Sequence, residues 1–462
     1  MAEEKRFAKE REKIESFSDF SNVYNFKKDF KYSYKTDAGL TEEIVREISA
    51  QKDEPEWMLQ ARLKSLELFY KIDYPTWGPD ISELQMDNIV TYVRPDAGLK
   101  ADWNEVPEDI KDTFDRLGIP DSEVVYHSIQ EELVKQGVVY TDFDTALKEH
   151  EDIVRKHFMK LIPPTDHKFA ALHGAVWSGG SFVYVPEGVQ VDIPLQSYFR
   201  LNAPGAGQFE HTMIIVEKGA KVHFIEGCSA PKYNVANLHA GAVELFIGDD
   251  ATLTYSTIEN WSKNMYNMNT KRSIVGKNGT MNWVTGSFGS HTSCLYPMTI
   301  LQGEGAHCEF TGVTFAGKGQ YLDTGSKVVH NAPNTTSNID SKSLSKSGGV
   351  CIYRGSVVIN EKAEGAKSNV SCESLMLDEI SQSDTIPAIV VKNDNIDLGH
   401  EAKIGRISDE AVYYLMSRGL SEDEARAMLV RGFVEPVSKA LPLEYAVEMN
   451  NLINLELKGS LK

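Results

Sequence analysis

The architecture follows from the segment IIVEKGAKVHFIEGC, residues 214–228, and from its counterpart LFIGDDATLTYSTIE, residues 245–259, which begins 31 residues later. In both, an apolar triplet precedes two other residues, a turn residue (Gly219 or Asp250) and then apolar positions that alternate as in a β-strand. We therefore expect two successive strand–turn–strand units that stack on each other.

The same pattern recurs through the middle of the chain. Its turn markers are Gly188, Gly219, Asp250, Gly279, Gly305 and Ala363, with spacings of 31, 31, 29, 26 and 58, the last being two periods of 29. A near-constant period in a strand-rich region is typical of a stacked solenoid, so we predict a mainly β protein built on a parallel β-helix. A left-handed hexapeptide solenoid would have a much shorter period. Chance recurrence of glycine in another all-β fold is the competing interpretation.

Helical patterns flank this block. Apolar residues at helical spacing over 40–48 and 57–69 predict a mainly helical N-terminal region, residues 1–165. The β-helix core is expected at 166–405. In the C-terminal region, 406–462, Ser408 can cap a helix to Arg418, Ser421 opens a capping box, and residues 443–457 form a third amphipathic stretch.

Composition excludes several classes of function. The 462 residues carry a formal net charge of −19, which repels nucleic-acid phosphate and anionic lipid, so we expect neither partner. No apolar run is long enough for a membrane helix, and the N-terminus has no signal-like segment, which predicts a cytoplasmic protein. Five cysteines without a CxxC pair are expected to be thiols.

One segment resembles a nucleotide-binding loop. Residues 312–318 match GxxxxGK, but Gly319 follows where a phosphate loop needs Ser or Thr, and the strand-like texture continues instead of a helix. We therefore assign no nucleotide site, and any ATP must be hydrolysed by another chain.

Three reactive side chains share one predicted position in the repeat. Cys228, Glu259 and Cys372 each lie nine residues after a marker, and Trp261 lies at plus eleven. Apolar residues that we predict to face the core occupy plus three and plus five: Val191, Val222 and Leu253, and Ile193, Phe224 and Tyr255. Since side chains alternate along a strand, the groups at plus nine and plus eleven are predicted to point into the tube, where polar groups are costly and function is sought. Buried cysteine as a small apolar residue is the structural alternative.

His400 and Glu401 follow Cys372 by about one period, so we expect them on an adjacent rung. Thiolate, imidazole and carboxylate together suit Fe²⁺ or Zn²⁺. The set is either a chance surface cluster or half of a metal site that a partner completes.

Seven segments carry a resemblance to a known family. They are EPEWMLQARLKSL from Glu54, SYFRLN from Ser197, EGCSAP around Cys228, ENW at Glu259, SNVSCESLML around Cys372, GHEAKIGRISDEAVYYLMSRG from Gly399 and EPVSKALPLEYAVEMNNLI from Glu435. In this order they resemble the SufB/SufD family of the SUF iron–sulfur cluster assembly system. The EGCSAP-type cysteine context favours the SufB branch over SufD.

The resemblance implies a right-handed parallel β-helix with helical ends, acting as a scaffold and not as an enzyme. It implies docking of a SufC-type ABC ATPase on the C-terminal helices, pairing with a SufD-type subunit or a second copy, and sulfur supplied by a cysteine desulfurase with its sulfur-transfer protein. The cargo is a transient iron–sulfur cluster, and a bound reduced flavin is left open.

The resemblance also implies residue roles. Cys228 resembles the sulfur acceptor. An internal sulfur path is matched by Arg200, Asn202, Trp261 and Lys277, and Glu259 stands at a further position of that path. Cys372 and Glu401, beside His400, match ligands of the nascent cluster. Two positions depart from the pattern, because Glu259 stands where relatives carry Gln and Gly399 where many carry Glu. Lys277 or Arg200 is expected to lower the pKa of Cys228 if the fold brings them close.

Two other classes stay open. A purely structural interaction solenoid would tolerate loss of every cysteine, and a carbohydrate-active β-helix enzyme would need paired carboxylates in an exterior groove.

Overall fold

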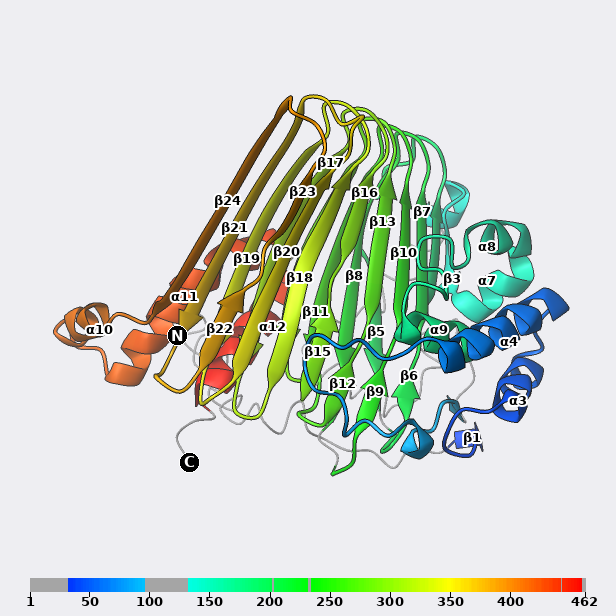
Figure 1. Ribbon diagram of the computed structural model, residues 1–462, viewed down its shortest axis with the longest axis horizontal. Helices are drawn as coiled ribbons and strands as arrows, with labels where there is room; N and C mark the ends of the chain where they lie inside the picture. Colours follow the sequence, from blue (N-terminus) through cyan, green and yellow to red (C-terminus); the bar gives the residue numbers. More distant parts are fainter. Residues whose placement is uncertain (1–31, 96–131, 202, 232–233, 442, 459–462) are drawn as a thin grey trace, which may run out of the picture.

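The computed structural model describes residues 32–95, 132–201, 203–231, 234–441 and 443–458. These residues form a parallel β-solenoid of about 8 turns with helices at both ends of the chain (Figure 1), which confirms the predicted fold class. In the described part of the chain, no helix has the length and apolarity needed to cross a membrane.

Two sheets form the tube. The first, here called the long wall, runs in the order β5 (Leu195–Arg200), β8 (Lys221–Ser229), β11 (Thr252–Asn260), β14 (Thr280–Phe288), β17 (His307–Ala316), β19 (Thr336–Ser345), β21 (Ala366–Met376) and β24 (Ile396–Arg406). All its neighbours pair in parallel and in continuous register.

The second sheet closes the tube opposite the long wall. Its first arm is β3 (Val139–Asp142), β4 (Ser181–Val185), β7 (His211–Val216), β10 (Ala242–Ile247), β13 (Thr270–Val275) and β16 (Met298–Leu301). Its second arm is β6 (Gly207–Gln208), β9 (Asn237–His239), β12 (Met265–Asn267) and β15 (Thr292–Leu295). Both arms join on β18 (Tyr321–His330), which pairs with β20 (Val350–Ile359). At the last coil, β20 pairs in turn with β22 (Gln382–Thr385) and β23 (Ala388–Val391).

A stack of left-handed residues makes the turn before the long wall. They are Gly188, Gly219, Asp250, Asn278, Gly305, Asn334 and Gly365, all with positive φ. Glycine, Asn and Asp tolerate this conformation best, which explains the repeating marker. Each turn also bonds to the next, as in Gly219 N–H to the Asp249 carbonyl at 2.8 Å. Of the predicted markers, Gly279 lies one residue late and Ala363 two residues early.

Alternate residues of the long wall fill the tube. Val222, Phe224, Leu253 and Tyr255 are buried in one apolar core, as predicted. The prediction that Ile193 faces this core is wrong, because its side chain is 46% exposed. The strand begins only at Leu195, so strand alternation does not extend back to Ile193.

The N-terminal helices cover the second sheet. The described ones are α3 (Glu42–Lys52), α4 (Glu56–Lys71), η2 (Met86–Asn88), α7 (Phe143–Glu149), α8 (Glu151–His157) and α9 (Lys168–Val176), with the strands β1 (Tyr32–Lys35) and β2 (Val93–Pro95) beside them. Helices α3 and α4 confirm the two predicted amphipathic segments. The side chain of Arg62, fully buried, holds α4 to α9 through the Ala175 carbonyl at 3.1 Å.

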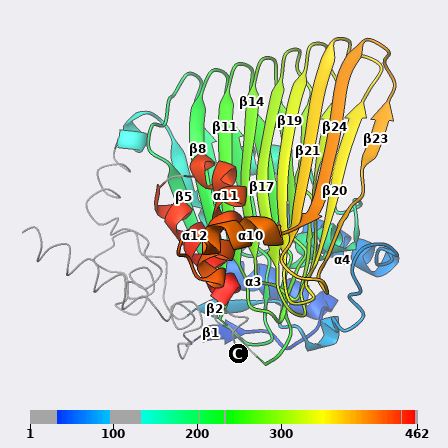
Figure 2. The same cartoon turned by 90° about the vertical axis from the view of Figure 1, so that its left-hand side faces the viewer.

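The C-terminal helices lie on the outer face of the long wall (Figure 2). They are α10 (Asp409–Met416), α11 (Glu422–Ala440) and α12 (Leu443–Lys458). The Ser408 cap and the Ser421 capping box are present as predicted, and the first helix ends two residues before Arg418. Helix α11 contacts β14 and β17, and α12 contacts β11. Val430 and Val434 of α11 belong to one apolar cluster with Ile225 and Ile258, which point outward from β8 and β11.

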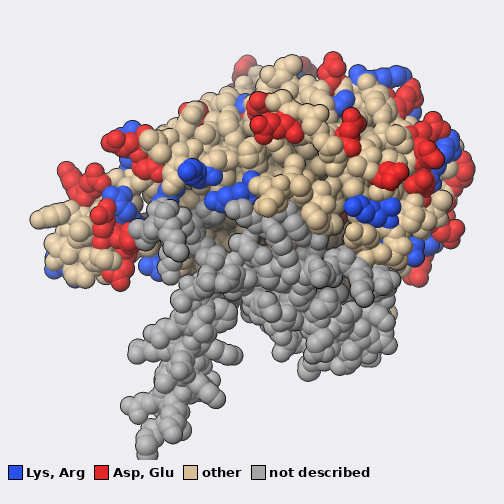
Figure 3. Space-filling model, turned by 90° about the horizontal axis from the view of Figure 1, so that it is seen from below, with Lys and Arg blue, Asp and Glu red and all other residues tan. Residues whose placement is uncertain are grey.

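The surface carries both signs of charge. On the face shown in Figure 3, acidic and basic side chains are interspersed among neutral ones over the described residues.

Candidate functional site

The register of the long wall fixes where the two candidate cysteines lie. Cys228 of β8 pairs with Glu259 of β11, so the prediction that they occupy the same position on successive coils is confirmed. We call such a row of register-paired residues across the long wall a column. That column continues through Ser287, Thr314, Ser343 and Ser374. The prediction that Cys372 belongs to it is wrong, since Cys372 sits two residues earlier on β21. The cause is the marker Ala363, which stands two residues before the true turn residue Gly365.

Cys372 nevertheless faces the same interior. Its own column contains Ser341, Gly312, Thr285, Thr257 and Glu226. A shift of two residues keeps the side of the sheet, so both thiols point into the tube. Five rungs separate β8 from β21, which at about 4.8 Å each puts the two cysteines roughly 24 Å apart along the solenoid.

Cys228 is buried among carboxylates. Its side chain is 1% exposed and packs beside Trp261 and Met265. Burial, reinforced by the carboxylates of Glu226, Glu210 and Glu259, holds the pKa of the Cys228 thiol well above its usual range. The expected depression of this pKa is therefore not what the structure gives.

Of the two cations predicted near Cys228, Arg200 lies on the neighbouring strand beside Ser229, whereas Lys277 is remote. Lys277 is exposed in the turn before β14, and the first residue of that strand, Thr280, is already roughly 23 Å along the wall from the level of Cys228. Arg200, at the end of β5, donates to the Ser229 hydroxyl at 2.9 Å. Asn202 falls outside the described residues.

Lys271 of β13 is the cation inside the tube. Its ammonium lies 3.1 Å from Glu259 Oε1 and 3.8 Å from Glu226 Oε1. Burial alone would lower the pKa of Lys271, but attraction to these two carboxylates outweighs burial and leaves the pKa raised. A carboxylate at 259, in place of the glutamine of relatives, is thus neutralised locally.

A chain of hydrogen bonds extends from Glu259. Asn267 donates to Glu259 Oε2 at 2.6 Å, and its own oxygen lies 2.7 Å from His239 Nδ1. His239 Nε2 in turn contacts Glu210. Burial acts against ionisation of both partners, yet their mutual attraction raises the pKa of His239 and lowers that of Glu210, so they form a buried ion pair.

Trp261 borders the same cluster. Its ring centroid lies 4.6 Å from that of His239, and it is 3% exposed. Within the described residues its indole N–H has no hydrogen-bond partner. The predicted inward position of Trp261 agrees with this packing.

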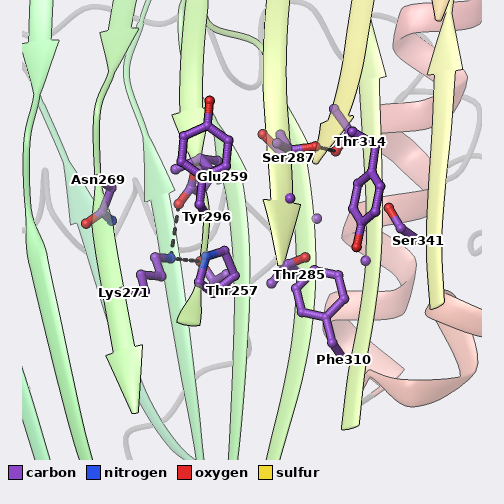
Figure 4. A pocket seen from close by; sticks show the side chains of 17 residues that line it. Thr257, Glu259, Asn269, Lys271, Thr285, Ser287, Tyr296, Phe310, Thr314 and Ser341 are labelled. Atoms are coloured by element: carbon purple, nitrogen blue, oxygen red, sulfur yellow. Dashed lines mark hydrogen bonds and ion pairs between the residues drawn. The ribbon is translucent and has the colours of Figure 1, made fainter. Parts of the chain in front are cut away.

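A narrow cavity begins beside this cluster (Figure 4). Its volume is about 30 Å³, which exceeds the roughly 10–15 Å³ that one water molecule needs. Its lining runs from Lys271 and Glu259 past Thr285 and Thr314 to Ser341 and Tyr353 (Figure 4). Because Ser341 pairs with Cys372 on the next rung, the cavity extends from the neighbourhood of one cysteine to that of the other.

Cys372 and His400 meet at the far end. Cys372 Sγ lies 3.7 Å from His400 Nε2, across the neighbouring strands β21 and β24, so the predicted adjacent rungs are confirmed. Burial, with a contribution from Asp340, raises the pKa of Cys372 to about 12. Glu401 points away from His400, is 63% exposed and contacts Lys403 at 3.1 Å. The described residues contain no group of three or more His, Cys, Asp or Glu placed to hold a metal.

The remaining cysteines pack in the fold. Burial raises the pKa of each of Cys294, Cys308 and Cys351 to about 12. The segment 312–322 forms the end of β17, a turn and the start of β18, as its strand-like texture predicted.

Sequence reasoning missed Lys271, Glu226, Asn267, His239 and Glu210. A signal exists for two of them. Glu226 lies seven residues after Gly219 and two before Cys228, so it is on the same face of the strand as Cys228. Lys271 lies four residues before the core residue Val275, so it also points inward.

Two family profiles match the chain. Residues 199–433 match the SufBD core domain of the SUF system for FeS cluster assembly, and residues 46–197 match the SufBD protein N-terminal region. With the solenoid fold, these matches define an iron–sulfur cluster assembly protein of the SUF system.

Similar proteins support the assignment. An iron–sulfur cluster assembly SufBD family protein of Staphylococcus aureus (strain MRSA252) is 52% identical over 452 residues, covering 95% of this chain and 97% of its own. One from Staphylococcus haemolyticus (strain JCSC1435) is 51% identical over 455 residues, covering 94% and 98%. The chain belongs to the SufBD family. Both relatives carry the family name alone, so the SufB branch stays a prediction.

Proposed function

We propose that this protein is a SufB-type scaffold that receives persulfide sulfur at Cys228 and passes it through the solenoid to a nascent cluster at Cys372. The donor is a cysteine desulfurase acting with a sulfur-transfer protein. The observation that carries the proposal is the cavity between the two cysteine neighbourhoods, which is mainly apolar and carries hydroxyl groups along its length. Small hydroxyl side chains at 285, 314 and 341 leave room for a sulfur atom that larger residues would fill.

The path residues follow from the same cavity. Glu259, Trp261 and Asn202 keep the path role that the resemblance gave them, and Arg200 lies at the beginning of the path, beside Ser229. Lys271 takes the place given to Lys277, because Lys271 is buried against Glu259 whereas Lys277 is exposed. A fixed ammonium can hold a polysulfide anion by charge as it moves along the tube.

The cluster would be built at the open end of the solenoid. Cys372 and His400 supply two ligands, and Glu401 is the third when edge strand β24 rearranges. The end strand β23 exposes Ile389, Val390 and Val391 by 42–46%, an apolar surface suited to a second solenoid subunit, either SufD-type or a second copy. That subunit would complete the ligand set of the cargo cluster.

A SufC-type ATPase is proposed to act on the C-terminal helices. Helix α12 packs on the back of β11, whose inner face carries Glu259, and α11 packs on β14 and β17. A displacement of α12 on ATP hydrolysis would reach Glu259, and Cys228 on the neighbouring strand, through a single sheet. Helix α10 projects beyond the wall and exposes Tyr413 by 74% (Figure 1), a surface for that partner.

Cluster reconstitution tests the proposal. We expect Cys372→Ala and Cys228→Ala to abolish recovery of iron and sulfide after anaerobic incubation with the ATPase, the partner subunit and the desulfurase. Cys351→Ala is the matched control, since Cys351 packs away from the cavity beside Ala316 and Leu322. Normal recovery in both test variants would overturn the proposal and favour a structural solenoid.

A further inference from the structure

Glu226 is a buried carboxylate beside the proposed sulfur acceptor. It lies two residues before Cys228 on β8, on the same inner face, which sets their backbones about 7 Å apart. Its side chain is fully buried. A glutamate can bridge that offset to a thiol directly or through one water.

One carboxylate oxygen of Glu226 accepts no hydrogen bond from the described residues. Oε2 accepts from the Thr212 hydroxyl at 3.2 Å across the tube. Oε1 has no hydrogen-bond partner among the described residues, and its nearest cation, Lys271, is 3.8 Å away. The buried Tyr255 hydroxyl faces Glu226 and interacts with it, but the two groups do not reach full hydrogen-bond geometry.

The other carboxylates of the cluster are engaged. Both oxygens of Glu259 accept charged or amide donors, from Lys271 and Asn267. Glu210 is ion-paired with His239. Burial raises the pKa of Glu226, whereas the pKa of Glu210 is lowered, so Glu226 has the greater affinity for a proton.

We propose that Glu226 accepts the proton of Cys228 when that thiol attacks a persulfide, an inference that rests on the proposed function. Cys228 is surrounded by apolar and anionic groups, so its reactive thiolate forms only if a neighbour takes the proton. The open Oε1 of Glu226 is the acceptor.

The step is balanced without an oxidant or reductant. The Cys228 S–H bond breaks and its proton moves to Glu226. The Cys228 sulfur then bonds to the outer sulfur of the donor persulfide, and the S–S bond of the donor breaks. The departing donor thiolate takes up a proton from Glu226, leaving a persulfide on Cys228 and a thiol on the donor.

The test measures persulfide loading at Cys228 itself. Full-length protein is mixed with glutathione persulfide, and the gain of one sulfur on the Cys228 peptide is followed by mass spectrometry between pH 6 and pH 10. For Glu226→Gln we expect a fall of about 10²-fold or more at pH 7, the usual contribution of a general base. Its rate should then climb about tenfold per pH unit as hydroxide replaces the base, whereas the wild-type rate levels off.

Two further variants separate chemistry from folding. Glu226→Gln leaves Lys271 paired with Glu259, so the buried charges stay balanced, and urea unfolding checks that the fold is retained. Glu226→Asp keeps a carboxylate and should keep the wild-type shape of the pH profile at a lower rate. Glu309→Gln, which removes a carboxylate from the outer face of β17, should match the wild type.

The outcomes are distinct. Loading of Glu226→Gln at the wild-type rate across the pH range would refute the role of Glu226 and leave the proposed function standing. No loading of Cys228 in the wild type would refute the proposed function itself.

Discussion

Gly312→Val is predicted to block the path inside the solenoid while leaving the protein folded. Gly312 lines the cavity and lies in the same column as Cys372, two rungs before it. A Cβ there would stand 2.8 Å from Thr285 Oγ1 and 2.9 Å from the Phe310 ring, so a valine has to occupy the cavity.

The cost to folding can be bounded. Overpacking a core costs about 1–3 kcal/mol, and replacing a glycine inside a strand returns about 0.5–1 kcal/mol. The net destabilisation is therefore about 0–2.5 kcal/mol, below the 5–15 kcal/mol or so that is typical of folded proteins. The valine methyl groups would narrow the cavity at a point that Gly312 leaves free, so we expect sulfur not to pass.

The assay follows labelled sulfur in the complex with the ATPase. We expect Gly312→Val to load Cys228 normally and to leave the label there, with little reaching Cys372. Gly405→Val is the control, because a Cβ at Gly405 meets nothing within 4 Å. Transfer to Cys372 at the wild-type rate in Gly312→Val would refute an internal path.

Three further predictions follow from the same contacts. Lys271→Met should lower the free energy of unfolding by about 3–5 kcal/mol, because it leaves two buried carboxylates without a cation. Adding Glu259→Gln should restore part of that free energy, and an unchanged urea midpoint in Lys271→Met would contradict the pairing. Burial lowers the pKa of His330 to about 4, so its stabilisation is complete above its ordinary pKa of 6.5 and is lost as the pH falls from 6.5 to 4. The loss is on the order of 3 kcal/mol, and it should vanish in His330→Gln; parallel pH dependences of the two proteins would count against it. Val391→Asp at the open end should weaken association with the second solenoid subunit about tenfold, or ~1.4 kcal/mol, as measured by sedimentation. The control Val134→Asp, also at an exposed position but distant in sequence, should not weaken it, and equal losses in the two variants would argue against this interface.

The solenoid could be predicted because its turns have a steric requirement. A left-handed residue must recur on every coil, and Gly219 and Asp250 meet that requirement visibly in the sequence. The register failed where turn length changed. Gly219 follows Val216 by three positions, but Gly365 follows Ile359 by six. The predicted marker Ala363 stands only four positions after Ile359, so Cys372 was displaced by two positions.

The site was predictable only in part for a related reason. Spacing places residues on a face, and it placed Cys228 and Glu259 together. It says nothing of which side chains meet across the tube, where Lys271 of one sheet reaches Glu259 of the other. Alternation also separates neighbours in sequence, so His400 reaches Cys372 while Glu401 points outward.

The order in which labelled sulfur appears on the two cysteines tests the central claim most directly. With the desulfurase, the transfer protein and the ATPase present, the account predicts label first on Cys228 and then on Cys372, and none on Cys372 in Cys228→Ala. Labelling of Cys372 at an undiminished rate in Cys228→Ala would contradict it.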